Sequence, residues 1–243
     1  MSHKLYPGSI ISKTAPTVVG PTNGEGGSAS GIWTMEQADY YIANGTWPKP
    51  FIAGGVWGMG TNNYGALGNN DTAGVSSPVQ AGSLTNWISV ASGSYHSVAV
   101  KTDGTIWSWG YNVFGMLGLG NVTDYSSPKQ VGSTSVWSSV SNCTMSVHAA
   151  SIRSDGTLWT WGYNAQGQLG LGNTTNYSSP KQVGALTTWS SVSVGGLFVL
   201  ATRTDGTLWS WGYNSQGQLG LGSTTNFSSP KQIGALTTWL SIA

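Results

Sequence analysis

The sequence predicts an all-β fold, a propeller made of repeats of about 50 residues. The first observation is a Trp-Gly pair whose tryptophan recurs at 57, 109, 161 and 211, at intervals of 52, 52 and 50 residues. The second is near-identity between units, since residues 158–193 and 208–243 agree at 28 of 36 positions. The third is that side chains within a unit alternate with the period of two that is typical of strands. About three and a half units are present, because only 32 residues follow Trp211.

Each unit is expected to contain four short strands. In the second unit the expected strands cover residues 87–91, 96–101, 106–109 and 126–132. The pair Asp103-Gly104 predicts a hairpin turn of type I′ between two of them, because Asp-Gly suits a turn with positive φ. Pro128 lies near the start of the fourth strand, where a missing amide is tolerated. A glycine-rich loop, 110–120, connects the third strand to the fourth.

The composition excludes several classes of protein. Only 7% of residues are charged, against about a quarter in most globular proteins, the net charge is +1, and the chain has 13 Trp and 36 Gly. This composition favours an uncharged polar surface over a tryptophan-rich interior rather than disorder. The sequence has no basic block that would indicate nucleic-acid binding. It also has no apolar run long enough to span a membrane. Residues 1–13 lack the apolar core of a signal peptide. The single cysteine, Cys143, excludes an intrachain disulfide and is expected to be buried in a strand.

The first 50 residues are predicted to precede the repeats of 51–243 as a separate region. Residues 1–30 are rich in Pro, Gly, Ser and Thr, which predicts an extended arm. Residues 31–50 predict one short amphipathic helix that begins after Thr34 and ends near Gly45. A helix of about ten residues needs a surface to dock on, either its own propeller or another protein. The candidate attachment residues are Trp33, Met35, Tyr40, Tyr41, Ile42 and Trp47.

The repeat itself carries a family resemblance. The loop "GYNSQGQLGLG" (212–222), the segment "SSPKQIG" (228–234), the Asp-Gly-Thr turn and a histidine seven residues before its aspartate, as at His96 and His148, resemble the repeat of regulator of chromosome condensation (RCC1) proteins. The resemblance covers roughly 52–243 and implies a seven-bladed propeller. It leaves the function open, because family members include exchange factors, enzyme inhibitors and other binding proteins. Phe198 stands where a third histidine belongs, which favours a structural role for the other two.

A second resemblance concerns the segment "SASGIWTMEQADYYIANGTWPKP" (28–50). It is similar to a stretch in structural proteins of tailed bacteriophages, especially marine ones, where it precedes variable or repeat domains. This implies an attachment element that contacts other virion proteins and carries an exchangeable displayed domain. The implied location is the virion, on its exposed surface or on a tail or other appendage.

No catalytic constellation is recognisable, so we expect no enzyme, no metal and no cofactor. His96 and His148 occupy equivalent places in different units and are expected to be far apart, and the acidic residues show no paired spacing. The candidate binding residues are instead a Tyr-Asn pair that recurs in each unit: Tyr111, Asn112, Tyr163, Asn164, Tyr213 and Asn214. If exposed, these side chains form an uncharged propeller rim suited to protein or sugar. The alternative is that the asparagine forms a turn while the tyrosine packs between units.

Three functions are compatible with these features. The first is a non-enzymatic structural component of a bacteriophage particle, anchored by its N-terminal segment and displaying the propeller toward a host surface protein or glycan. The second is a free protein-binding propeller of the enzyme-inhibitor or exchange-factor type, and the third is a carbohydrate-binding propeller.

The visible repeats are too few for a seven-bladed ring, and an open ring exposes strand edges and apolar side chains. Three explanations are open: the chain continues, two chains combine into one ring or a larger homo-oligomer, or the last unit packs against another protein in an assembly. The sequence favours the first or the third. The second agrees with the count of about three and a half units per chain, which is half of seven.

Overall fold

The computed structural model describes residues 54–93, 95–141, 146–239 and 242. The chain divides into two units, 1–52 and 53–243, and all described residues belong to the second. The predicted arm, the predicted helix with its six attachment residues, and Cys143 lie outside the described residues.

Every regular element in the described residues is a β-strand, which confirms the predicted all-β fold. The strands are β1 (Trp57–Gly60), β2 (Val75–Gln80), β3 (Trp87–Ser92), β4 (His96–Lys101), β5 (Ile106–Gly110), β6 (Tyr125–Gln130), β7 (Trp137–Ser141), β8 (His148–Arg153), β9 (Leu158–Gly162), β10 (Tyr177–Gln182), β11 (Trp189–Val194), β12 (Phe198–Arg203), β13 (Leu208–Gly212) and β14 (Phe227–Gln232). They form antiparallel sheets in chain order: β1–β2, β3–β6, β7–β10 and β11–β14, here the first to fourth sheets.

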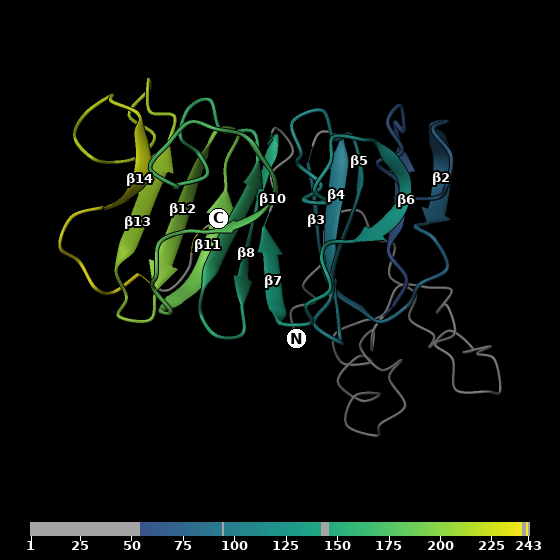
Figure 1. Cartoon of the computed structure of the whole chain (residues 1–243), viewed down its shortest axis with the longest axis horizontal. Coiled ribbons are helices and arrows are strands. Elements are labelled where there is room, and N and C mark those ends of the chain that lie inside the picture. Colours follow the sequence, from purple (N-terminus) through teal and green to yellow (C-terminus); the bar gives the residue numbers. More distant parts are fainter. Residues whose placement is uncertain (1–53, 94, 142–145, 240–241, 243) are drawn as a thin grey trace, which may run out of the picture. The chain divides into compact units, whose positions relative to one another are not determined.

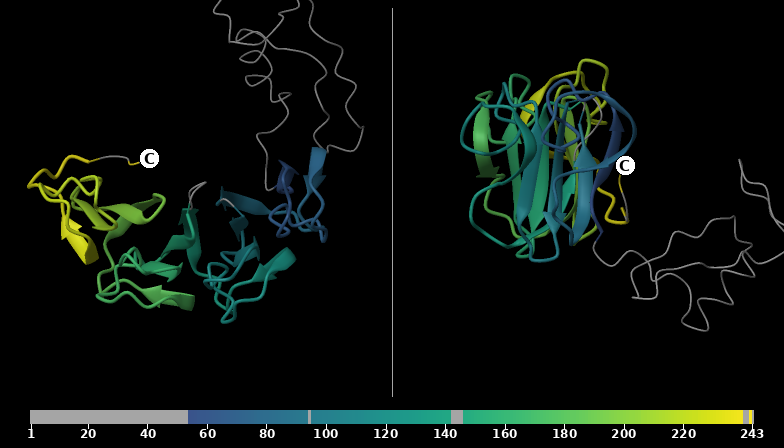
Figure 2. Two further views of the ribbon diagram at one scale, coloured as in Figure 1. Left: turned by 90° about the horizontal axis from the view of Figure 1, so that it is seen from above. Right: turned by 90° about the vertical axis from the view of Figure 1, so that its right-hand side faces the viewer.

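The sheets of this unit follow one another in space as they do in sequence, from the blue first sheet to the yellow-green fourth (Figure 1). Seen from above, they lie along an arc (Figure 2). The core is divided in the same way, because each buried cluster combines side chains from neighbouring sheets. One cluster joins Val98, Val100 and Ile106 of the second sheet to Trp137 and Trp161 of the third. No sheet therefore buries its apolar face alone, as the repeat period predicts.

The hairpin turn differs from the predicted type I′. The amide of Gly104 donates to the carbonyl of Lys101 at 2.9 Å, and the Lys101 amide donates to the Thr105 carbonyl at 3.0 Å. Gly104 has a φ of 75°, whereas Asp103 is not among the residues with positive φ. The connection is therefore a type I turn followed by a left-handed glycine, the usual form for a three-residue hairpin loop. A type I′ turn would need positive φ at both central residues.

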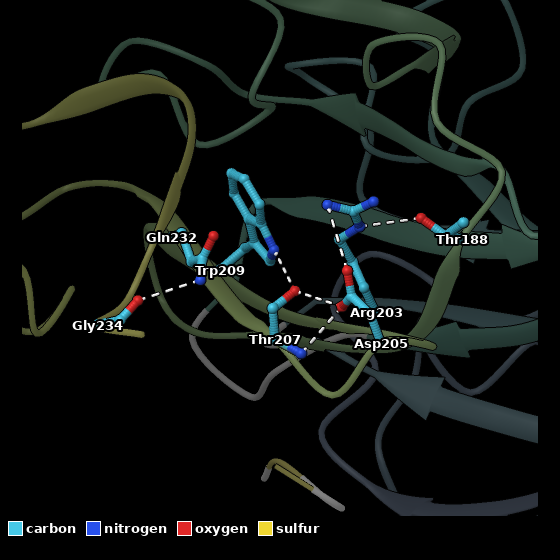
Figure 3. A network of polar contacts seen from close by, with 7 residues as sticks. All are labelled: Thr188, Arg203, Asp205, Thr207, Trp209, Gln232 and Gly234. Carbon is cyan, nitrogen blue, oxygen red and sulfur yellow. Dashed lines mark hydrogen bonds and ion pairs between the residues drawn. The ribbon is translucent and has the colours of Figure 1, made fainter. Parts of the chain in front are cut away.

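The aspartate of each turn holds a short polar network (Figure 3). In the fourth sheet, Asp205 accepts hydrogen bonds from the amide (3.1 Å) and the hydroxyl (2.6 Å) of Thr207, whose hydroxyl accepts the indole N–H of Trp209 at 2.8 Å. Arg203 lies 3.8 Å from the Asp205 carboxylate and donates from Nε to Thr188 at 2.9 Å. Hydrogen bonds from threonine lower the pKa of the turn carboxylates. The recurring Asp-Gly-Thr-x-Trp pattern thus has a structural role.

Neighbouring sheets are connected by a junction that occurs three times. At each junction a tryptophan indole in the third strand of one sheet donates to a carbonyl in the glycine-rich loop of the preceding repeat, at 2.8–3.0 Å. An amide at the end of that loop donates to a serine carbonyl in the fourth strand of the next sheet at 2.7 Å. The indole bonds are Trp109 to Ala66, Trp161 to Met116 and Trp211 to Gln168, and the amide bonds are Asn70 to Ser126, Gly120 to Ser178 and Gly172 to Ser228.

One glycine per loop makes this junction possible. Gly65, Gly115 and Gly167 have φ of 77–79°, and a Cβ on any of them would lie 2.4–2.6 Å from the Cα of the serine in the next sheet. Such a separation is far inside van der Waals contact, so only glycine allows the loop to reach the neighbouring strand.

The first unit is aligned differently from the sequence prediction. Trp57 pairs with Gln80 as Trp107 pairs with Gln130. Gly60 has the same φ, 105°, as Gly110. Trp57 is therefore the equivalent of Trp107, and the first interval is 50 residues rather than 52. Met59 is the equivalent of Trp109. Each of the other copies has two tryptophans two residues apart, and the first copy lacks the second of them.

Candidate interaction surface

The three asparagines of the predicted rim are buried inside their loops. Asn112, Asn164 and Asn214 each have 0% exposure. Oδ1 of Asn164 accepts the amide of Leu169 at 2.9 Å, while its Nδ2 donates to the carbonyls of Asn173 and Thr175 at 3.0 and 2.9 Å. The rim prediction was wrong for these three residues, and the alternative, that asparagine forms the turn, is confirmed. Loop carbonyls and amides that face inward need a partner, and the asparagine amide supplies both a donor and an acceptor.

The three rim tyrosines are half-buried and lie in different surroundings. The ring of Tyr111 lies 4.4 Å from that of Tyr64 and 6.2 Å from that of Tyr95, and Tyr64 and Tyr95 are 5.2 Å apart. Tyr163 lies 4.8 Å from Phe114. Tyr213 has no ring contact with another described residue. Two of the three tyrosines therefore belong to clusters between sheets, where aromatic side chains from two repeats meet.

These clusters expose large apolar side chains at the loop end of the first three sheets. The exposed fractions are 37% for Tyr64, 47% for Tyr95, 44% for Val113 and 38% for Phe114. We define the aromatic surface as Tyr64, Tyr95, Tyr111, Val113, Phe114 and Tyr163. The exposed carboxylate of Asp124 lies beside this surface and accepts the amide of Asn112 at 2.7 Å.

The aromatic surface contains positions at which the repeats differ. Tyr64 and Phe114 follow their loop asparagine by two residues, where the next two repeats carry Gln166 and Gln216. Tyr95 precedes β4, where the corresponding residues are aliphatic. The sequence prediction missed Tyr64, Tyr95 and Phe114 because it searched for residues that recur. The signal that could have found them is aromatic substitution in otherwise similar copies.

The two histidines at the starts of β4 and β8 are sealed from solvent. His96 is 1% exposed and His148 0%. Burial lowers the pKa of His96 to about 4. It lowers that of His148 to about 3, with a smaller contribution from the charge of His96. The charge of His96 thus contributes to the lowered pKa of His148, although the two residues belong to different sheets. At neutral pH both rings are uncharged.

Other features of the described residues offer less. No three His, Cys, Asp or Glu side chains of the described part of the chain come together as metal ligands would. An apolar pocket of about 390 Å³ lies between the third and fourth sheets, lined by Leu171, Leu186, Trp189, Trp209 and Pro230, with Gln182 and Ser229 as polar side chains. Among the residues that the structure describes, no helix is long and apolar enough to cross a bilayer.

Comparison with solved structures matches this architecture to known propellers. Human WBSCR16 superimposes with a TM-score of 0.65 and 24% identity, over 74% of this chain and 47% of that protein. Yeast RCC1 (Prp20), solved bound to Kap60, superimposes with a TM-score of 0.67 and 23% identity, over 76% of this chain and 46% of Prp20. The chain thus spans about half the length of these propellers. At such identities the likeness shows the fold alone.

The sequence comparisons agree with the structural ones. The E3 ubiquitin-protein ligase HERC2 of Homo sapiens is 29% identical over 133 residues, which is 54% of this chain and 3% of HERC2. The family model described as the regulator of chromosome condensation (RCC1) repeat matches residues 53–100, 103–146, 155–202 and 205–243, most of the chain. A second model with the same description matches 87–115 and 189–218. The chain therefore belongs to the RCC1 repeat family.

Proposed function

We propose that the repeats form a non-enzymatic, protein-binding propeller and that a partner protein rests on the aromatic surface. The observation that carries the proposal is that exposed aromatic side chains, Tyr64 and Phe114, stand where the other two copies have glutamine, while the buried loop asparagine is the same in all four copies. Aromatic residues are enriched in the centres of protein interfaces, and charged residues are depleted there. The surface has the first of these properties.

The structural neighbours support a binding role. Prp20 was solved in complex with Kap60, and binding of Prp20p to Gsp1p and to histones has been described with its crystal structure. All of these partners are proteins. Transferred to this chain, the likeness supports a protein partner as a class and identifies no particular one.

A paired substitution tests the aromatic surface. Tyr64→Ser with Tyr95→Ser removes two exposed rings, and the control is Gln216→Ser, which changes the position equivalent to Tyr64 in the last repeat. Each immobilised protein is incubated with an extract of its native source, and retained proteins are quantified by mass spectrometry. We expect at least one protein retained by the wild type and by the control to fall at least tenfold with the double variant. The proposal fails if the double variant retains every protein as well as the wild type does. It also fails if the wild type, but not the double variant, binds glycans on an array.

We propose further that this propeller is displayed on a bacteriophage particle, with residues 31–50 as the attachment segment. The support is the resemblance of residues 28–50 to virion proteins, together with the low charge and the recent duplication of the repeats. In this role the partner on the aromatic surface is a host surface molecule.

The display role is tested by mass spectrometry of particles purified from the native source. Peptides of this chain are expected at a stoichiometry of several copies per particle. Their absence from intact, infectious particles, while they are present in the infected-cell extract, would contradict a virion location and leave the free propeller as the function.

A further inference from the structure

The junction between the first and second sheets carries two carboxylates that the other described junctions lack. The amide of Asn70 donates to the carbonyl of Ser126 at 2.7 Å. Asp71 follows that asparagine, and Asp124 precedes that serine by two residues. The equivalent residues at the next two junctions are asparagines: Asn121 with Asn176, and Asn173 with Asn226. The first junction therefore differs from its copies by two negative charges that flank one hydrogen bond.

The loops do not need these charges in order to fold. Oδ1 of Asp124 accepts the amide of Asn112 at 2.7 Å, and Asn176 and Asn226 accept the corresponding amides at 2.8 Å. Asp71 uses its Oδ1 in a similar way, for two amides of its own loop at 2.7 and 3.2 Å. Asparagine thus performs the structural task of the aspartate. What the aspartates add is charge.

The ring of Tyr64 lies beside one of these carboxylates. It is 4.4 Å from the ring of Tyr111, and Asp124 accepts the amide of the next residue, Asn112. The third junction shows that the two positions can touch. There Nδ2 of Asn226, the equivalent of Asp124, donates to Oε1 of Gln166, the equivalent of Tyr64, at 2.7 Å. The first junction replaces this amide pair by an aromatic ring and a carboxylate.

The two carboxylates have no cation beside them among the described residues. The ion pair that this part of the chain contains joins Arg203 to Asp205, in the turn between β12 and β13. Oδ2 of Asp71 and of Asp124 has neither a hydrogen bond nor an ion pair with a described residue. Both side chains are exposed. The position of Asp124 is also exposed in the third and fourth sheets, so its exposure is a property of the junction.

We propose that a basic side chain of the partner protein, arginine in preference to lysine, docks between the ring of Tyr64 and the carboxylates of Asp71 and Asp124. This inference rests on the proposed function, because it specifies the partner on the aromatic surface. A guanidinium group stacks on an aromatic face and pairs with a carboxylate through parallel N–H donors. The exposed ring supplies the face, and each aspartate supplies a free oxygen. The partner therefore presents an arginine-bearing segment to this junction.

The test uses the complete chain and an array of synthetic peptides of one length. Each arginine peptide has a lysine and a citrulline counterpart, since citrulline keeps the shape of arginine without its charge. We expect the wild type to bind arginine peptides at least tenfold more tightly than their citrulline counterparts, with lysine peptides between them. Binding should weaken as salt is added, because exposed charges are screened.

The first variant is Asp71→Asn with Asp124→Asn. Asparagine stands at both places in the other described junctions, so the variant should fold as the wild type does. We expect it to lose at least tenfold in affinity for the arginine peptides and to bind the citrulline peptides unchanged. Urea unfolding of both proteins verifies that the fold is kept.

Two reciprocal variants separate the ring from the charge. Asn121→Asp with Asn176→Asp places two carboxylates at the second junction, beside the exposed ring of Phe114. Asn173→Asp with Asn226→Asp places them at the third junction, where the equivalent residue is a glutamine. We expect the first of these variants to gain affinity for arginine peptides and the second to gain less.

Three results would overturn the proposal. The first is a wild type that binds arginine and citrulline peptides equally or binds neither, and the second is arginine binding that survives Asp71→Asn with Asp124→Asn. The third is saturable binding of Ca²⁺ in calorimetry that this variant abolishes, because the carboxylates would then hold a metal ion. The protein-binding function is decided separately, by whether retained proteins depend on Tyr64 and Tyr95.

Discussion

His148→Phe is expected to remove much of the acid sensitivity of the fold. Burial lowers the pKa of His148 from 6.5 to about 3 and that of His96 to about 4. A histidine that stays neutral when folded but takes a proton when unfolded makes the unfolded state bind more protons below pH 6.5. The free energy of unfolding therefore keeps its full value above pH 6.5, and it falls as the pH drops from 6.5 toward the pKa of the folded state.

The size of this effect is large for one side chain. At about 1.36 kcal/mol per pKa unit, His148 accounts for a loss on the order of 3 kcal/mol between pH 7 and pH 4. Phenylalanine is the natural choice of substitution, because Phe198 starts β12 as His148 starts β8. Phenylalanine also removes two ring nitrogens that have no hydrogen-bond partner among the described residues, so stability at pH 7 should be equal or higher.

Urea unfolding at pH 7.0 and pH 4.5 measures the difference. The turn aspartates do not obscure it: hydrogen bonds from threonine lower their pKa below its ordinary value of 3.8, so the stability that they contribute is lost mostly below pH 4.5. The variant should lose markedly less stability than the wild type between the two pH values. Equal losses would show that His148 is protonated in the folded state or that other groups control the acid response.

Gly167→Ala is expected to separate the third sheet from the fourth. The added Cβ would lie 2.6 Å from Cα and 2.8 Å from Cβ of Ser228. Neither backbone can move without disturbing the bonds from Gly172 to Ser228 and from Trp211 to the Gln168 carbonyl. Forced overpacking of this kind costs about 1–3 kcal/mol, in addition to about 1–2 kcal/mol for a non-glycine residue in the left-handed region.

The matched control is Gly184→Ala, which has a φ of 60° and no atom within 4 Å. It carries the conformational strain without the clash, so the difference in urea stability between the two variants isolates the junction. Tryptophan fluorescence, which sums the signals of all 13 Trp, should show unfolding of Gly167→Ala at a lower urea concentration than that of Gly184→Ala. Equal stabilities of the two variants would mean that the loop can shift away from Ser228 at little cost.

The strands were predictable because local signals in each unit agree. The expected segment 96–101 coincides with β4, and 87–91 falls short of β3 by one residue. Alternation of period two, an Asp-Gly pair and a proline each act over a few residues, so a single unit contains all the information needed. The turn type was not predicted correctly because Asp-Gly fits two hairpin geometries. In the three-residue loop that forms, Thr105 donates from its amide and its hydroxyl to Asp103.

The site was less predictable, since exposure depends on neighbours in other repeats. Asn112 and Tyr111 are adjacent in sequence, yet one is sealed within its loop and the other meets Tyr64 and Tyr95 from the preceding repeat and from its own sheet. Both residues recur in each unit, so their sequence pattern offers no reason to separate them. Only the packing of two sheets decides which of them a partner can reach.

The sequence by itself determined the repeat, its strands, the all-β class and the family, because each of these depends on local pattern. The tertiary structure alone decided that Met59 takes the place of Trp109, that the charge of His96 acts on His148, and that a Cβ at Gly167 would meet Ser228 while one at Gly217 would meet no atom within 4 Å. These facts concern contacts between residues some 50 positions apart. Such contacts arise when one sheet packs on the next, and a pattern read within a single repeat does not contain them.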